Sequence, residues 1–333
     1  MFRRFYSLAC LTFLLGFGLQ LAEAQTFRRN SDKIKPSQKI TVDQSGHGNF
    51  STIQSAIDSI PSNNKFWVVI RVKAGTYREK VKIPYDKPYI ILKGEGKRKT
   101  NVVWDDHENL AQSPTFSSMA DNTVVKSMSF RNSYNDPNSK NRIIAAAAAM
   151  ITGDKSSFYR CGFFGLQDTL WDDQGRHYYE RCTIQGAVDF IFGAGQSIFE
   201  RCSISVNGNE LGSLAGFITA QGRTNPNDGN GFVFKDCHVF GTGSAYLGRP
   251  WRDYARVLFY KSNFSSIVQP EGWEVTHNFD ENKLTFAEYG CFGPGADTSK
   301  RVKWEKKLDV KTVEKLTDIS FIDSEGWLQK QPH

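Results

Sequence analysis

The sequence lacks the short motifs of several large enzyme classes. It contains no GxSxG segment, and none of its six histidines stands in a recognisable catalytic-triad context. It has no HExxH, P-loop or GxGxxG pattern, and no CxxC pair or His-rich spacing that would suggest zinc. Serine-hydrolase, zincin, phosphate-loop and dinucleotide-binding chemistry are therefore not indicated.

Long apolar runs are missing except near the N-terminus, where the run is shorter than the ~20 residues of a membrane span. Arg3 and Arg4 precede this run, and the small residues "AEA" end it at Ala24, as at a signal peptidase site. The pattern predicts a cleaved signal peptide over residues 1–24, an N-terminal tail over 25–39 and a secreted product. A membrane anchor is the alternative, which the short run disfavours.

Cysteine is scarce, and its number is odd once Cys10 has left with the signal peptide. The remaining residues are Cys161, Cys182, Cys202, Cys237 and Cys291, so at least one thiol is free or pairs between chains. Whether the others are bonded or reduced stays open. Asn49 and Asn263 begin sequons that a secretory route could glycosylate.

The charge is basic, with a formal net value of +7 at pH 7. Nucleic acid, an anionic membrane or an acidic polymer are the possible partners. Secretion argues against nucleic acid, and no membrane partner is expected. A polyanion outside the cell is the better candidate.

Long helical patterns are not obvious, whereas a strand-like segment recurs. Similar segments at variable intervals of this size are typical of a solenoid whose loops differ in length. We expect each coil to contribute one such strand, and we predict an all-β fold, a right-handed parallel β-helix, as a single domain over residues 40–333. The segments are "FYRCGF" (158–163), "YERCTI" (179–184), "FERCSI" (199–204), "FKDCHV" (234–239), "FYKSNF" (259–264) and a weaker "VKSMSF" (125–130).

Two aspartates follow this repeat at one spacing. Asp168 comes seven residues after Cys161, and Asp189 comes seven residues after Cys182. If the coils stack in register, the two carboxylates lie ~5 Å apart on adjacent coils. Two carboxylates at that distance resist ionising together, so the pair suits a catalytic acid beside a nucleophile or base.

The segment "AYLGRPWRDYAR" (245–256) adds a cation and an aromatic ring. Arg249 near one aspartate would keep it ionised and leave the other protonated. Trp251 offers a flat face on which a sugar ring can stack. A surface charge and a core aromatic are the alternatives. The acidic pairs in "WDDH" (104–107) and "WDDQ" (171–174) could bind calcium, but a lone pair is more often a turn.

At this point the sequence resembles the plant pectin methylesterase family. The blocks that carry the resemblance are "ITVDQSGHGNFSTIQSAIDSIP" (40–61), "GTYREKV" (75–81), "FYRCGFFGLQDTLW" (158–171), "VDFIFGAG" (188–195), "YLGRPWRDY" (246–254) and "EYGCFGPGA" (288–296). The resemblance covers about residues 40–327. The chain resembles the short type, without the N-terminal inhibitor-like region of many relatives.

The resemblance implies a β-helix that hydrolyses methyl esters of cell-wall homogalacturonan, without metal or cofactor. It implies Asp189 as nucleophile, Asp168 as general acid and then base, and Gln167 as an oxyanion donor. Arg249 would orient Asp189, and Trp251, Trp171 and Phe192 would bind the sugar together with Arg249. A monomer is expected, with pectin and a proteinaceous pectin methylesterase inhibitor as partners.

Two departures from the family pattern bear on activity. A family "QAVAL" block would place a second oxyanion glutamine where Ala145 stands, and an "NTAG" block reads "RNSYND" (131–136) here. Loss of one oxyanion donor typically costs ~10²–10³ in rate. A weak or inactive pectin-binding relative is therefore an alternative function. A retaining glycosidase, which also uses carboxyl groups ~5 Å apart, and a pectate lyase are less favoured.

Overall fold

Short parallel strands dominate the structure, which is a computed structural model. It describes residues 36–136, 141–274 and 279–332, and those from Pro36 to Gln331 form one unit. The predicted signal peptide and most of the predicted tail lie outside the described residues. The first strand begins at Gln38, two residues before the predicted boundary at Ile40.

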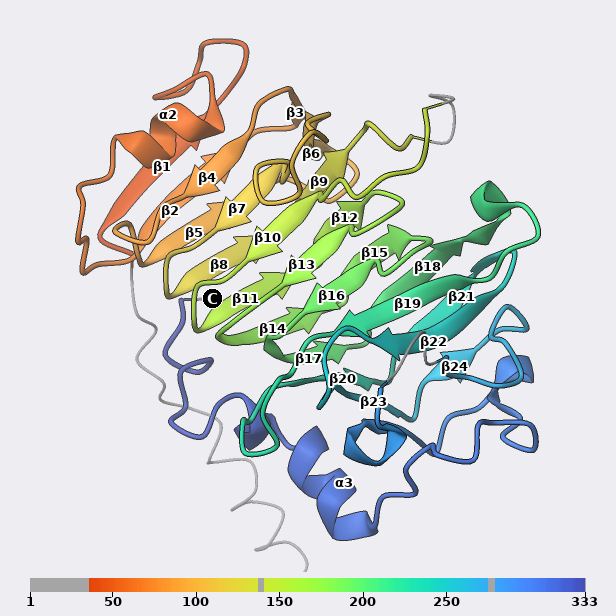
Figure 1. Cartoon of the computed structure of the whole chain (residues 1–333). Helices are drawn as coiled ribbons and strands as arrows, with labels where there is room; N and C mark the ends of the chain where they lie inside the picture. Colours follow the sequence, from red (N-terminus) through yellow and green to blue (C-terminus); the bar gives the residue numbers. More distant parts are fainter. Residues whose placement is uncertain (1–35, 137–140, 275–278, 333) are drawn as a thin grey trace, which may run out of the picture. The chain divides into compact units, whose positions relative to one another are not determined.

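The strands form three parallel sheets around one core (Figure 1). Sheet A has ten strands, in spatial order β1 (Gln38–Val42), β2 (Val68–Val72), β5 (Ile90–Lys93), β8 (Thr123–Lys126), β11 (Ser156–Tyr159), β14 (Arg176–Glu180), β17 (Gln196–Glu200), β20 (Gly231–Lys235), β23 (Arg256–Tyr260) and β25 (Thr285–Tyr289). Sheet B has eight, β3 (Gly75–Tyr77), β6 (Thr100–Trp104), β9 (Ser129–Asn132), β12 (Gly162–Phe164), β15 (Thr183–Gly186), β18 (Ser203–Asn207), β21 (His238–Thr242) and β24 (Asn263–Phe264). Sheet C has seven, β4 (Val81–Ile83), β7 (Phe116–Ser118), β10 (Ala149–Ile151), β13 (Leu170–Asp172), β16 (Ile191–Gly193), β19 (Gly216–Gln221) and β22 (Ala245–Pro250).

From β2 to β22 the chain visits sheets A, B and C in turn, so each complete coil adds one strand to each sheet, whereas β1 and β23 to β25 belong to incomplete terminal coils. The predicted right-handed parallel β-helix is confirmed. The predicted register is confirmed as well, since Phe158 pairs with Tyr179 in sheet A and Phe163 with Ile184 in sheet B.

One detail of the repeat differs from the expectation. Each repeated segment is two strand ends joined by a corner rather than one strand. The third residue of each segment is left-handed, with φ between 46° and 56°, and such a residue cannot continue a strand. These corner residues are Ser127, Arg160, Arg181, Arg201, Asp236 and Lys261.

Aromatic rings stack along the inside of sheet A. Phe158, Tyr179, Phe199, Phe234 and Phe259 occupy one position of five successive coils, with ring centroids 4.8, 4.5, 4.6 and 4.5 Å apart. Neighbouring strands lie ~4.8 Å apart, so an in-register repeat brings the rings to stacking distance. This column makes the core continuous from coil to coil and stabilises the register.

The cysteines form a second buried column at the corner between sheets A and B. All five described cysteines are free, and four are buried. The Cys161 thiol donates to the carbonyl of Val125 at 3.4 Å, and that of Cys182 to the carbonyl of Phe158 at 3.4 Å. The column therefore replaces disulfides with buried, weakly hydrogen-bonded thiols.

Two helices cover parts of the solenoid. Helix α2 (Ile53–Asp58) is capped by Thr52 and packs beside β1, β2 and β4 at the N-terminal end. Helix α3 (Val310–Thr317) is capped by Asp309, and the C-terminal segment around it covers the outward side chains of β17, β20 and β23 (Figure 1). Within the described ranges, no helix is long and apolar enough to cross a membrane.

Candidate active site

Asp168 and Asp189 lie at one corner of adjacent coils, where sheet B gives way to sheet C. Gln167 bridges to Val188, and Leu170 pairs with Ile191, so the two aspartates occupy equivalent positions. Both have left-handed backbones, with φ of 60° and 47°. Non-glycine residues in this region cost energy and cluster at functional sites. The predicted placement of the two aspartates at equivalent positions of adjacent coils is confirmed.

Arg249 holds Asp189 in a two-point ion pair. Its Nε donates to Oδ1 of Asp189 at 2.9 Å, and its Nη2 donates to Oδ2 at 2.6 Å. A bidentate charge-assisted pair of this kind fixes the carboxylate plane and favours the ionised form. Of the two aspartates, Asp189 is therefore the one held as an anion.

Asp168 lies in different surroundings. It is 9% exposed, and burial, followed by the charge of Asp189, raises its pKa to about 7, while Arg249 opposes the rise. One carboxyl thus holds a proton near neutral pH beside an ionised carboxylate. This division is what an acid–nucleophile pair needs.

The position of Arg249 follows from its strand. On β22 it pairs with Ala220, which pairs with Phe192 on the previous coil. The small Ala220 side chain leaves room for the guanidinium to reach back to Asp189. The guanidinium also lies 4.2 Å from the ring centroid of Phe217, which stacks on Tyr246. This cation–π contact adds a second restraint on Arg249.

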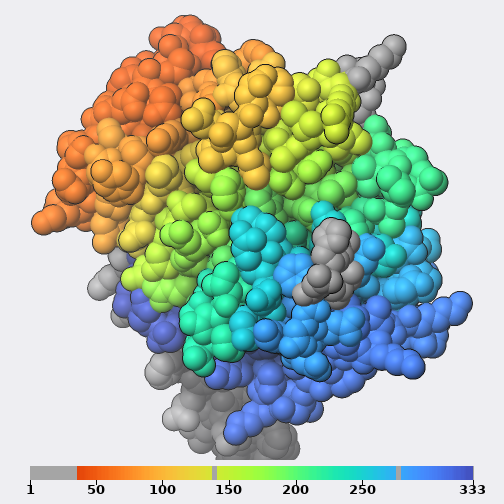
Figure 2. Space-filling view, in the orientation of Figure 1, coloured from red at the N-terminus to blue at the C-terminus, as the bar shows by residue number. Residues whose placement is uncertain are grey.

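Three aromatic rings form a wall on the outer face of sheet C. Trp171 stacks on Phe192 with centroids 5.4 Å apart, and Phe192 meets Trp251 edge-on at 5.9 Å. Sheet C faces the viewer in Figure 1, and its green-to-cyan C-terminal coils make up the middle of the face in Figure 2. Phe192 is only 3% exposed, so the half-buried Trp171 and Trp251 offer the aromatic surface on which a sugar ring can pack. The structure therefore brings Trp171, Phe192 and Trp251 together.

Gln167 and Ala145 lie side by side on adjacent coils. Ala145 bridges to Gln167, which bridges to Val188. Both side chains are half-buried, whereas the next four alanines, residues 146–149, are at most 1% exposed. The position at which the family pattern has glutamine thus faces the site here, but it carries a methyl group.

The segment 131–136, which departs from the family's "NTAG" block, holds the alanine-rich strand. The Asn132 amide donates to the carbonyl of Ala147 at 3.2 Å and to that of Ser113 at 3.4 Å. Asn135 donates to Ile144 and accepts from its N–H. Although this segment departs from the family pattern, its asparagine side chains still hydrogen-bond to the stretch that carries Ala145 and help to position it.

Aspartates of the two acidic pairs form ion pairs or hydrogen bonds with other side chains. Asp105 pairs with Arg78 at 2.7 Å, and Asp106 pairs with Lys80 at 2.5 Å. Asp172 is fully buried and accepts from Tyr179 Oη at 2.6 Å and from Ser197 Oγ at 2.7 Å. Within the described parts of the chain, no three His, Cys, Asp or Glu side chains form a metal-binding group.

Phe217 and Tyr246 were missed by the sequence reasoning. Neither residue belongs to the cysteine column, which is the repeat that the sequence pattern makes visible. An alignment of β19 with β22 could have found them, since Phe217 pairs with Tyr246 in register.

Comparisons with known proteins identify the family of the chain. The family model described as Pectinesterase matches residues 39–325. Probable pectinesterase 29 of Arabidopsis thaliana is 62% identical over 302 residues, which is 89% of this chain and 90% of that protein. Probable pectinesterase 55 of the same plant is 59% identical over 306 residues, which is 90% of this chain and 92% of that protein.

Solved structures share the fold. A pectin methylesterase from carrot aligns with a TM-score of 0.82 at 29% identity and covers 91% of this chain and 98% of its own. A pectin methylesterase solved in complex with a hexasaccharide aligns at 0.74 with 24% identity, over 86% of this chain and 97% of its own. The β-helix, the extent of the family match and the identity to plant relatives lead to one assignment: the chain belongs to the pectinesterase family of carboxylic ester hydrolases.

Proposed function

We propose that the protein hydrolyses methyl esters of pectin to pectate and methanol through an acyl-enzyme on Asp189. The observation that carries this proposal is the unequal pair of carboxyls on adjacent coils. Asp189 is held as an anion by Arg249, while Asp168 retains a proton to about pH 7. An ester needs both a nucleophile and a proton donor for its leaving group.

In the first half-reaction, a carboxylate oxygen of Asp189 attacks the ester carbonyl carbon. Each carboxylate oxygen has two lone-pair sites, so the bonds from Arg249 leave electrons for the attack. The carbonyl oxygen becomes negative and takes a hydrogen bond from the Gln167 amide. As the carbon–methoxy bond breaks, the proton of Asp168 passes to the methoxide, and methanol leaves.

In the second half-reaction, water cleaves the anhydride between Asp189 and the sugar acid. Asp168 is now ionised and takes a proton from the attacking water. The carbon–oxygen bond to Asp189 breaks, which restores its carboxylate and releases the acid product. Trp251, Trp171 and Phe192 bind the sugar rings during both steps.

The sequence and the relatives support a proposal for where the reaction takes place. The relatives are named pectinesterases and the carrot protein a pectin methylesterase, which supports pectin as the substrate. The signal-like N-terminus supports secretion to the cell wall, where a monomer could meet an inhibitor protein. Asn49 is exposed and Asn263 half-buried, so glycosylation is more favourable at Asn49.

The decisive experiment measures methanol and new reducing ends released from esterified pectin. An esterase releases methanol alone, whereas a glycosidase or lyase shortens the chain. We expect Asp189→Asn and Asp168→Asn each to lower the rate at least a thousandfold with unchanged circular dichroism. Asp253→Asn, at an exposed aspartate after Trp251, should keep the wild-type rate. Activity within tenfold of wild type in Asp189→Asn would exclude it as the nucleophile.

A catalytically weak pectin binder is the second candidate, and Ala145 is the observation that favours it. The half-buried methyl group of Ala145 beside Gln167 offers no hydrogen-bond donor to an oxyanion. Pectin binding without methanol release by the wild type would support this reading.

A further inference from the structure

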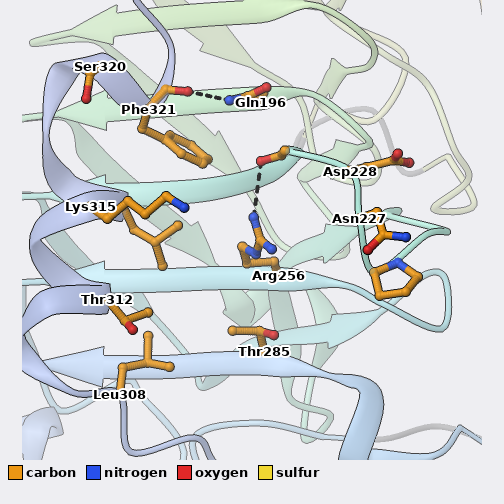
Figure 3. Close-up of a pocket in the computed structure, with 13 residues that line it drawn as sticks. Gln196, Asn227, Asp228, Arg256, Thr285, Leu308, Thr312, Lys315, Ser320 and Phe321 are labelled. Carbon is orange, nitrogen blue, oxygen red and sulfur yellow. Dashed lines mark hydrogen bonds between the residues drawn. The ribbon is translucent and has the colours of Figure 1, made fainter. Parts of the chain in front are cut away.

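A cavity of about 810 Å³ lies outside the catalytic wall, between sheet A and the C-terminal segment. Its walls are the loop 226–229, strands β23 and β25, and residues 308–321 (Figure 3). None of the proposed site residues lines it. Pockets of ~300–1,000 Å³ are typical of small-molecule sites, so the cavity is large enough for more than one sugar ring.

Two cations point into this cavity without a carboxylate partner. Figure 3 shows the Lys315 side chain extending toward Arg256, and both residues line the cavity. In the described part of the chain, no acidic side chain lies within ion-pair distance of either group. The hydrogen bond from the Arg256 guanidinium goes to the carbonyl of Gly229 at 3.2 Å.

The surroundings of Arg256 make its charged form unfavourable unless an anion pairs with it. Burial, together with nearby Arg223, lowers its pKa to about 10. The Arg223 guanidinium is itself bound to backbone carbonyls, those of Asp228 and Tyr254 among them. Asp228, the acidic residue at the rim, points away from Arg256 in Figure 3. The local field is therefore positive, and an anion in the cavity would be stabilised.

The other lining groups match a sugar better than a bare anion. Thr285 and Ser320 offer hydroxyl groups, and the Gln196 amide, which donates to the carbonyl of Phe321, adds a further polar group. Phe321, Leu308 and Pro226 supply apolar surface against which a sugar ring can pack. We propose that this cavity is a second, non-catalytic binding site for acidic sugars, with Arg256 and Lys315 binding the carboxylate.

The cavity would bind the product of the reaction rather than its substrate. Methyl-esterified residues are neutral, and the proposed function makes them anionic, so this cavity would favour stretches that have already been de-esterified. The choice of an acidic sugar rests on the proposed function, whereas the anion site rests on the cavity alone. Gln221, the last residue of β19, joins the two regions, since its carbonyl accepts from Trp251 N at 3.0 Å and its side chain accepts from Arg256 N at 2.9 Å.

Calorimetry with a short de-esterified oligogalacturonate tests the proposal. The protein is the full mature chain carrying Asp168→Asn, which prevents turnover and leaves Arg249 paired with Asp189, and Trp251→Ala, which weakens binding at the catalytic wall. We expect binding to persist in this variant and to weaken at least tenfold when Arg256→Gln or Lys315→Gln is added. Lys315 lies on the exposed side of α3, so its variant should fold normally even if Arg256→Gln does not. Lys303→Gln, at an exposed lysine of the same C-terminal segment, is the matched control and should change affinity less than twofold.

Further ligands identify what the cavity recognises. A fully methyl-esterified oligomer should bind at least tenfold more weakly than the acid form. Equal affinity for the ester, no effect of Lys315→Gln, or inorganic phosphate binding as tightly as the oligomer would overturn the acidic-sugar site. Methanol release from a short esterified oligomer by the single variant Lys315→Gln should equal that of wild type. Failure of the proposed function would instead appear as absent methanol release in the wild type.

Discussion

Asp168 and Asp189 carry the same side chain in two different electrostatic surroundings. The Arg249 guanidinium binds both oxygens of Asp189, whereas Asp168 is buried without such a partner beside a negative charge. Ionisation costs a carboxyl group more free energy in the second environment. The difference in environment therefore separates an acid from a nucleophile among chemically identical residues.

The raised pKa of Asp168 predicts a pH-dependent cost in stability. Its pKa is about 7 in the folded protein and 3.8 for an unperturbed aspartate, so the folded state binds the extra proton between these pH values. The stability from this group is present below pH 3.8 and is lost as pH rises to about 7. Asp168→Asn should therefore gain stability relative to wild type across this window, by at most about 4 kcal/mol. Denaturant unfolding at several pH values measures the difference.

Asp253→Asn is the control and should show no such trend. In the wild type, kcat/KM should also fall above about pH 7, because the leaving group then lacks its acid. The two aspartates interact, so the profile reports the pair. A stability difference that does not change between about pH 4 and pH 7 would contradict the assignment of the proton to Asp168.

Ala145 predicts a gain of function. Ala145→Gln would place an amide beside Gln167, where charge develops mainly in the transition state. We expect kcat to rise about 10–100-fold with a smaller change in KM, as measured by methanol release. An unchanged rate in a stable variant would show that another donor already serves the oxyanion.

The matched control for this variant is Ala147→Gln. Ala147 is fully buried, whereas Ala145 is half-buried. Overpacking a core costs ~1–3 kcal/mol or more, so Ala147→Gln should be destabilised without any gain in rate. Thermal melts measured alongside the rates distinguish a loss of stability from a loss of catalytic activity.

At the scale of elements, the corners decide where the functional groups lie. A single left-handed residue turns the chain from sheet A into sheet B, and Asp168 and Asp189 are left-handed where sheet B passes into sheet C. A side chain at such a corner stands at the edge between two faces rather than within one. This placement lets Asp189 meet Arg249, which comes from β22 two coils later.

The cysteine column extends further than the sequence pattern indicated. Phe292 bridges to Asn263, so Cys291 stacks above Ser262. Gly290, with φ of 64°, takes the corner that the other segments fill with non-glycine residues. The segment "EYGCF" was missed because its first position is Glu288 rather than an aromatic residue.

This column predicts unreactive thiols. Burial raises the pKa of Cys161, Cys182 and Cys202 well above the ordinary value, and that of Cys291 to about 12. The thiolate is the reactive form, so a thiol reagent at about pH 8 should label none of the five cysteines quickly in the native protein. In denaturant without reductant, all five should react. Fewer than five would reveal a disulfide, and fast native labelling would contradict the burial of the column.

At the scale of the whole molecule, charge predicts how the protein meets its polymer. The net charge is +7, and exposed charges are screened within ~8 Å at physiological ionic strength. We expect tighter binding to de-esterified than to fully esterified pectin at low salt, with the difference shrinking as salt is added. Binding isotherms on both polymers from about 20 mM to about 500 mM salt test this expectation. Affinity for de-esterified pectin that does not change with salt would argue against electrostatic attraction.

The sequence by itself determined the coil register and the pairing of the aspartates. In-register stacking depends on similar segments that recur along the chain. Asp168 and Asp189 follow Cys161 and Cys182 at the same spacing, and this spacing can be counted in the sequence. The parallel β-helix was predictable from the same repeat, whereas the family was predicted from the resemblance of the sequence blocks. The signal peptide, the domain boundaries and the roles of the site residues stay predictions.

Only the tertiary structure decided which aspartate is ionised and what surrounds the pair. Arg249 lies 60 residues after Asp189, and loops of unequal length separate the two coils between them. Sequence spacing therefore could not say which carboxylate the guanidinium reaches, nor that Phe217 lies beneath it. The cavity of Arg256 and Lys315 draws its walls from Gln196 to Phe321. Such a site exists only after the C-terminal segment packs on sheet A, because long-range packing rather than local pattern brings its walls together.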